Sequence, residues 1–139
     1  MEKIEKLKKI FKKEKIDGYI IPKNDEFFGE YVPEYNDRLH FISSFTGSYG
    51  FALVLKDKNY LFVDGRYTLQ ANNQSGRMFK IITIPDKMPN DILKGKKLLI
   101  GFDPNLFTEK SLFIFFGNNK FKLKSISQNF IDVIWNSMR

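Results

Sequence analysis

Several residue types on which enzymes often depend are absent or rare in this sequence of 139 residues. There is no cysteine, which excludes disulfides, thiolate metal ligands and cysteine nucleophiles, and agrees with a reducing compartment. The one histidine, His40, stands between Leu39 and Phe41, where a histidine is more often packed or capping than catalytic. A zinc site would need several carboxylates at suitable spacing, and no such spacing stands out. We therefore assign no catalytic residue and no metal site to the chain itself.

Arginine is also scarce. Lysine and arginine together number 23, but only four of these residues are arginine, and the formal net charge is +7. A basic balance invites a nucleic-acid interpretation, yet the lysines are spread along the chain, and phosphate-binding sites usually rely on the guanidinium fork. We favour a solvated lysine surface and expect no nucleic-acid partner.

Long apolar runs are missing from the beginning of the chain. Within residues 1–11 no apolar run exceeds two residues, which predicts neither a signal peptide nor a membrane span there. We therefore expect a cytoplasmic protein with no membrane partner.

Aromatic residues, in contrast, are abundant. Fifteen Phe and six Tyr contribute to a hydrophobic content of 42%, enough for one substantial core. The length is near the commonest domain size, and no linker or internal repeat divides the chain. We expect residues 1–139 to form a single domain.

Hydrophobic periodicity and turn residues predict the order of the elements. Ile4, Leu7, Ile10 and Phe11 recur at helical spacing and predict a helix at 2–15. The further elements, in chain order, are a strand at 19–21, a long surface connection at 23–36, a helix at 33–44, a hairpin at 51–55 and 60–63, a short helix through 73, strands at 78–84 and 98–101, a helix capped by Thr108 through 116, an edge strand at 121–123 and an apolar segment at 130–135. This order predicts an α/β domain with a mixed sheet of about six strands flanked by helices.

Three acidic residues fall at the ends of predicted strands: Asp17, Asp64 and Asp103. If their carboxylates met at one edge of the sheet they could hold Mg²⁺, as in ribonuclease-H-like nucleases. The usual role of an aspartate before Gly or Pro is turn formation and capping, and all three positions fit that role. We favour capping, and keep a Mg²⁺-dependent nuclease or a basic nucleic-acid-binding module as the alternative.

The most distinctive short motif is Asp64-Gly65-Arg66-Tyr67. An arginine at a corner between strand and helix presents a rigid fork that can clamp a carboxylate or a peptide carbonyl. Gly65 would permit a sharp turn, and Asp64 could orient the guanidinium. The alternative is an arginine that pairs with carboxylates of its own domain, and composition and spacing do not separate the two.

Several blocks of the sequence, taken in order, resemble the three-domain Xaa-Pro aminopeptidases (aminopeptidase P) of the creatinase/prolidase superfamily. The resemblance covers nearly the whole chain and includes the hairpin. The blocks are Tyr19-Ile20-Ile21-Pro22, Glu30-Tyr31, Arg38-Leu39-His40-Phe41-Ile42-Ser43-Ser44-Phe45-Thr46-Gly47-Ser48, Asp64-Gly65-Arg66-Tyr67 with Leu69-Gln70-Ala71, Gly101-Phe102-Asp103-Pro104, and Asn129-Phe130-Ile131-Asp132-Val133-Ile134-Trp135. The chain departs from the family at Ser44, where glycine is common.

The resemblance implies the creatinase N-terminal fold, which is ribonuclease-H-like in its core motif. In this family two similar N-terminal domains precede a pita-bread domain, where two Asp, one His and two Glu bind two metal ions, usually Mn²⁺. We expect that domain to lie outside this chain. The resemblance therefore implies a non-catalytic domain that helps wall the substrate cleft and supports assembly, with its own C-terminal domains, a homodimer and peptides with proline in second position as partners.

The resemblance also implies site residues. The arginine of the family's Asp-Gly-Arg-Tyr motif contacts substrate and corresponds to Arg66, with Asp64, Gly65 and Tyr67 as support. Arg38 and the turn at 45–49 are weaker candidates for the same wall. We therefore expect Arg66 to bind the peptide.

Overall fold

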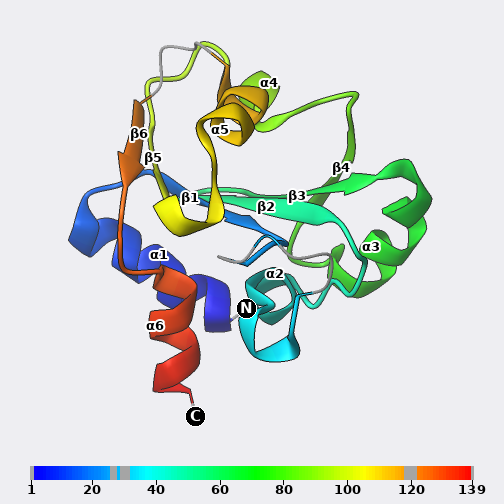
Figure 1. Cartoon of the computed structure of the whole chain (residues 1–139), viewed down its shortest axis with the longest axis horizontal. Helices are drawn as coiled ribbons and strands as arrows, with labels where there is room; N and C mark the ends of the chain where they lie inside the picture. Colours follow the sequence, from blue (N-terminus) through cyan, green and yellow to red (C-terminus); the bar gives the residue numbers. More distant parts are fainter. Residues whose placement is uncertain (1, 26–27, 29–31, 118–121, 139) are drawn as a thin grey trace.

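The computed structural model describes residues 2–25, 28, 32–117 and 122–138. Its centre is a six-stranded sheet of order β4-β3-β2-β1-β5-β6 (Figure 1). The strands are β1 (Gly18–Pro22), β2 (Gly50–Leu55), β3 (Asn59–Asp64), β4 (Lys80–Ile84), β5 (Leu99–Phe102) and β6 (Lys122–Ser125). Strand β2 runs antiparallel to both of its neighbours, and the other pairings are parallel. The expected mixed sheet is confirmed.

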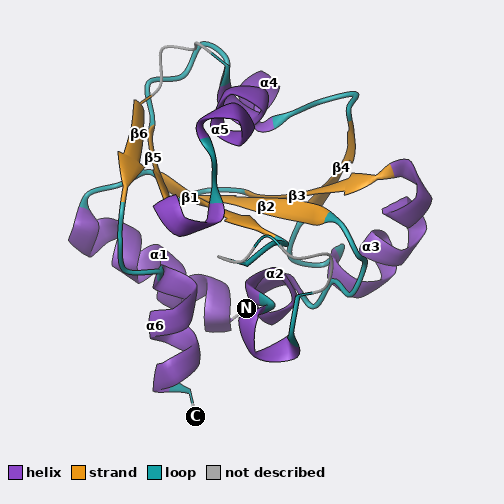
Figure 2. Ribbon diagram, in the orientation of Figure 1, coloured by secondary structure: helices purple, strands orange, loops and turns teal. Residues whose placement is uncertain are grey.

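Helices cover both faces of the sheet (Figure 2). One face carries α1, α2, α3 and α6, and the other carries α4 and α5 (Figure 1). The helices are α1 (Glu2–Glu14), α2 (Arg38–Ser43), α3 (Thr68–Ser75), α4 (Pro89–Leu93), α5 (Glu109–Phe116) and α6 (Phe130–Ser137), with 3-10 turns η1 (Glu34–Asn36), η2 (Gly65–Tyr67) and η3 (Pro104–Leu106). Each layer buries its own apolar cluster against the sheet.

Aromatic side chains fill both clusters. On the face covered by α1 and α6, Phe11 and Phe45 are fully buried, and the ring of Tyr19 lies 4.9 Å from that of Phe130. On the other face Phe51 stacks between Phe62 and Phe115. Because β1 and β2 are covered on both sides, every residue in them is buried, which explains their continuous apolar sequences.

The elements follow the predicted order, with shifts of one or two residues at several ends. The main difference lies at 33–44, where one helix was expected. The chain forms η1 and then α2, separated by Asp37, because the side chain of Asp37 accepts a hydrogen bond from the backbone N–H of His40 and caps α2. Helix α4 was not predicted, and the apolar segment at 130–135 is the helix α6.

Some predictions fall partly outside the described residues. These are the middle of the surface connection at 23–36, the block Glu30-Tyr31, and Phe121 at the start of the predicted edge strand. The described part of that strand, β6, does form the edge next to β5. Among the helices that the structure describes, none combines the length and the apolar character that a membrane crossing requires.

Candidate functional site

The Asp64-Gly65-Arg66-Tyr67 motif forms an exposed corner between β3 and α3. Asp64 ends β3, and its Oδ1 accepts hydrogen bonds from the backbone N–H of Arg66 at 2.9 Å and from Nε of Arg66 at 3.2 Å. The guanidinium also lies 5.4 Å from the centre of the Tyr67 ring. The Arg66 side chain nevertheless remains 75% exposed. A surface arginine is thus oriented by two neighbours and still open to a ligand.

The two contacts from Arg66 also set the charge state of Asp64. The backbone N–H of Arg66 is the larger cause, and its side-chain N–H the next, by which the pKa of Asp64 is lowered from the ordinary value. Hydrogen bonds donated to a carboxylate favour its charged form. Asp64 therefore stays ionised and keeps the guanidinium beside it at neutral pH.

Gly65 does not have the role that the sequence suggested. Its backbone is outside the positive-φ region, and a Cβ at this position would meet only Thr83 Cγ2 at 3.8 Å, an ordinary contact. Neither backbone conformation nor space requires glycine here. The corner is instead formed by the side-chain cap of Asp64 on η2.

Tyr67 joins the corner to the loop that follows α2. Its hydroxyl lies 2.5 Å from Oγ of Ser48, and its ring packs edge-on against the buried Phe45 at 6.0 Å. Gly47 is needed in this loop, because a Cβ there would lie 2.2 Å from the Phe45 ring. The loop at 45–49 therefore belongs to the same site as Arg66.

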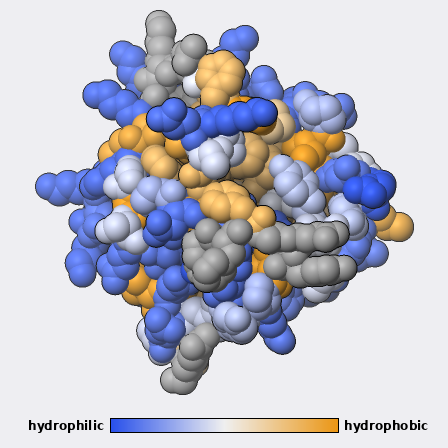
Figure 3. All heavy atoms as spheres, viewed as in Figure 1, coloured by the Kyte–Doolittle hydropathy of each residue, from blue (hydrophilic) through white to orange (hydrophobic). Residues whose placement is uncertain are grey.

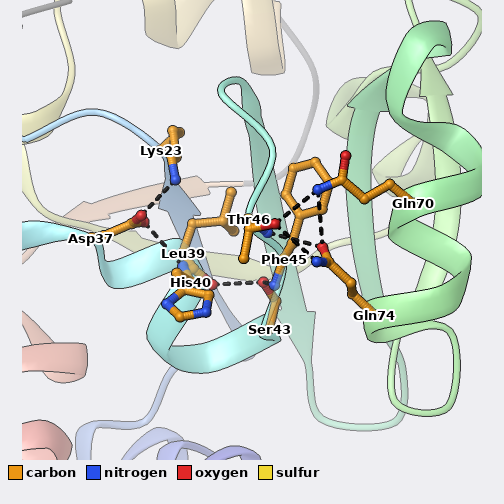
Figure 4. A network of polar contacts seen from close by, with 9 residues as sticks. All are labelled: Lys23, Asp37, Leu39, His40, Ser43, Phe45, Thr46, Gln70 and Gln74. Atoms are coloured by element: carbon orange, nitrogen blue, oxygen red, sulfur yellow. Dashed lines mark hydrogen bonds and ion pairs between the residues drawn. The ribbon is translucent and has the colours of Figure 1, made fainter. Parts of the chain in front are cut away.

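A polar network fixes this loop to α3, as Figure 4 shows. Gln74 accepts a hydrogen bond from the backbone N–H of Thr46 at 3.0 Å, and both Gln70 and Gln74 donate to Oγ1 of Thr46 at 2.8 Å. Gln70 occurs in one of the family-like blocks, but no local pattern indicated Gln74. Thr46, the partner of Gln74, is 28 positions earlier in the chain.

Ser44, the departure from the family pattern, ends α2 in the left-handed conformation, with φ of 66°. This is the conformation that glycine adopts without steric cost, and a residue with a Cβ adopts it only at some expense. The turn is therefore formed with serine in a conformation suited to glycine.

Arg38, the weaker candidate, lies inside the domain. Its side chain is only 8% exposed, and its Nε and Nη2 atoms donate to the two carboxylate oxygens of Asp132 at 2.8 and 3.0 Å. The pair joins the start of α2 to the first turn of α6. This geometry favours a structural role for Arg38 and separates it from the exposed Arg66.

The three strand-end aspartates do not converge. Asp17 precedes β1, whereas Asp64 ends β3 and Asp103 follows β5. Both strands run parallel to β1, so Asp17 lies at the opposite end of the strands. Three strand spacings separate β3 from β5, about 14 Å. Asp17 accepts from the backbone N–H of Leu99, and Asp103 caps η3. Asp64 and Asp103 have the expected capping role, whereas Asp17 binds the backbone of β5 instead. The nuclease alternative gains no support.

The fold and the site together define a class of protein: an α/β domain with an exposed, oriented arginine just after the end of a sheet strand. Over residues 2–25, 28, 32–117 and 122–138, no three His, Asp or Glu side chains are grouped closely enough to hold a metal ion. The described residues thus do not fit the pair of metal ions that the resemblance implies.

Residues 3–115 match the Creatinase/Prolidase N-terminal domain, and the chain belongs to this family. It is 34% identical over 143 residues to a probable Xaa-Pro aminopeptidase P of Coprinopsis cinerea, and 34% identical over 148 residues to one of Laccaria bicolor. These matches cover 96% and 99% of this chain, but 23% of each relative. The chain therefore spans about a quarter of the length of these curated relatives.

Solved structures of other proteins contain a domain with the same fold. The X-prolyl aminopeptidase of Caenorhabditis elegans, a cytosolic enzyme with a di-nuclear active site, superposes with a TM-score of 0.83 at 29% identity, over 99% of this chain and 26% of that enzyme. The N-terminal domain of the peptidase PepQ from Mycobacterium tuberculosis superposes with a TM-score of 0.71 at 21% identity, over 95% of this chain and 97% of that one. The second likeness concerns the fold alone.

Proposed function

We propose that this chain is the non-catalytic N-terminal domain of a metal-dependent Xaa-Pro aminopeptidase, which removes the N-terminal residue that precedes proline. The observation that carries the proposal is the match of nearly the whole chain to about a quarter of two probable Xaa-Pro aminopeptidases P. In this proposal two divalent metal ions, Mn²⁺ by family resemblance, are held by a separate pita-bread domain. They supply the activated water there.

The domain's own contribution is a contact to the peptide through Arg66. Asp64 engages Nε, so the terminal nitrogens of the exposed guanidinium can donate to a peptide carbonyl or carboxylate. Because the guanidinium is already oriented, less side-chain freedom is lost on binding. Arg66 thus acts as a substrate-binding residue, and Asp64 and Tyr67 as its support.

The domain would also form one wall of the substrate cleft and take part in assembly, with its own C-terminal domains and with a second subunit of a homodimer. A cytoplasmic location agrees with the absence of cysteine and with the cytosolic enzyme of Caenorhabditis elegans. The peptide contact is the part of the proposal that a single substitution tests most directly.

The test uses the polypeptide in which this domain is joined to its metal-binding domain. Arg66→Ala should lower kcat/KM for an Ala-Pro-Ala-Ala peptide roughly tenfold, mainly through KM, because a hydrogen bond from a charged donor is lost. Arg77→Ala is the matched control, since Arg77 is also exposed but precedes β4. Because β3 and β4 are parallel, Arg77 lies at the opposite end of the strands from Arg66. Equal kcat/KM values for Arg66→Ala and the unsubstituted enzyme would contradict the proposal.

A further inference from the structure

An apolar groove lies where β1 ends and β2 begins, at the same end of the strands as the arginine corner. Its volume is about 310 Å³, and its lining includes Phe51, Phe107 and Phe115. Tyr49 and Ile114 form part of its rim, and they are 48% and 53% exposed. Aromatic and aliphatic carbon therefore dominates a hollow that is open to solvent.

The groove is held open by contacts between segments far apart in the chain. At the end of β1, Asn24 donates to the backbone carbonyl of Leu106 in η3 at 2.8 Å, and Lys23 pairs with Asp37. Phe51 on the floor stacks against Phe115 of α5 at 4.3 Å. Because these contacts tie its floor to one wall, the hollow is preformed, as is usual for binding sites.

Exposed apolar side chains concentrate around this groove. Phe28, Tyr49 and Ile114 line it while about half exposed, and Phe113 is 60% exposed on the same helix as Ile114. In Figure 3 orange atoms gather across the middle of the face that Figure 1 shows, where η3 and the start of α5 lie. Contiguous exposed apolar surface of this kind marks interaction sites on proteins.

The groove and Arg66 lie at the same end of the strands of the sheet. Arg66 follows the end of β3, and the groove is centred on the end of β1, with the start of β2 between them. Ser48 contacts Tyr67 of the corner, and the next residue, Tyr49, lines the groove. Two strand spacings separate β3 from β1, about 10 Å, which an extended peptide covers in about three residues.

We propose that this groove binds an apolar or aromatic side chain of the peptide substrate, about three residues from the carbonyl or carboxylate that Arg66 holds. The inference rests on the proposed function and adds a substrate class: extended peptides with a large apolar residue at a set distance from the arginine contact. The groove is assigned to the peptide because the loop at 45–49 connects it to the arginine corner, at the same end of the strands. The domain then selects substrates by sequence.

The test measures binding of peptides to the purified 139-residue chain by NMR titration. The probes are heptapeptides with the sequence Ala-Pro followed by five alanines, in which one Phe replaces each of the last five positions in turn. One position of Phe should improve the dissociation constant roughly tenfold over the all-alanine peptide, because a Phe side chain leaves water. The amide signals of Tyr49 and Phe51 should shift with that peptide.

Matched variants assign the effect to the groove. Tyr49→Ser and Ile114→Ser change half-exposed side chains, so the fold should persist, and each should reduce the Phe preference to about threefold or less. Tyr35→Ser, at an exposed tyrosine that does not line the groove, should leave the preference intact. Arg66→Ala should weaken all peptides but keep the preference for Phe.

Three outcomes would overturn the proposal. The first is equal binding at every Phe position while Arg66→Ala still weakens all peptides, which leaves the proposed function standing without the groove. The second is a Phe preference that Tyr49→Ser and Ile114→Ser do not reduce. The third is dimerisation of the chain in sedimentation experiments that Tyr49→Ser abolishes, which would assign the groove to a second copy.

Discussion

Asp64 and Arg66 are two positions apart, and the same two residues decide both the shape and the charge of the corner. Asp64 caps η2 through the backbone N–H of Arg66 and also holds the Arg66 side chain. Because the carboxylate is the bound form, the pair persists at neutral pH. Its contribution to folding is lost as the pH falls through the lowered pKa of Asp64.

The Asp64 carboxyl therefore gives a direct test of the corner. In Arg66→Ala the guanidinium is lost but the backbone N–H, the larger cause, remains, so the pKa of Asp64 should rise part of the way to its ordinary value. The side-chain carboxyl ¹³C signal, followed through an acid titration, measures this change. Arg77→Ala serves as the control and should not move the pKa. An unaltered Asp64 titration in Arg66→Ala would show that the guanidinium does not lie on the carboxylate.

At the scale of elements, the Arg38–Asp132 pair fastens α2 to α6. Asp132→Ala should lower the free energy of unfolding by about 2 kcal/mol, since a buried guanidinium loses its carboxylate. This is less than for a fully buried pair, because Asp132 is 42% exposed. Urea unfolding measures the change. Glu2→Gln, which removes the exposed partner of Lys6, should cost less than about 0.5 kcal/mol. Equal effects of the two substitutions would contradict the structural role of Arg38.

The end of α2 offers a substitution that should stabilise the domain. Ser44→Gly should raise the free energy of unfolding by about 1 kcal/mol, because the left-handed conformation has no steric cost for glycine. Thermal and urea unfolding measure the gain. Ser44→Ala keeps the Cβ and should bring no such gain. A loss of stability in Ser44→Gly would mean that the serine side chain matters more than the backbone conformation.

The order of elements was predictable because it depends on local patterns. Thr108 capped the expected helix, and the hairpin formed where its turn residues lie. The predictions that differ concern long-range contacts or short elements. The helix at 33–44 is split at Asp37, which also pairs with Lys23 from the end of β1. Helix α4 has only five residues, too few for a periodic pattern.

The candidate site was only partly predictable, for a similar physical reason. Asp64, Arg66 and Tyr67 are adjacent in sequence, so a short motif could reveal them. The partner of Arg38 is 94 positions away, and no local pattern indicated that this arginine would be buried. The groove is assembled from segments near residues 22, 50 and 106–115, and its residues carry no shared motif. Only the folded sheet brings them together.

At the scale of the whole molecule, the chain has a preorganised arginine corner and a neighbouring apolar groove, and its described residues contain no grouping of metal ligands. Both features lie at the same end of the strands, β1 for the groove and β3 for the corner, where one peptide can reach them together. In the proposed function, peptide recognition belongs to this domain and the chemistry belongs to other parts of the parent enzyme.

The most direct measurement incubates the purified chain with Mn²⁺ and an Ala-Pro peptide and follows free alanine by NMR. We expect the peptide to remain intact while its signals respond to binding, and Arg66→Ala to weaken this response roughly tenfold. Release of alanine that depends on Mn²⁺ and stops when a chelator is added, with contaminating peptidase excluded, would contradict this expectation.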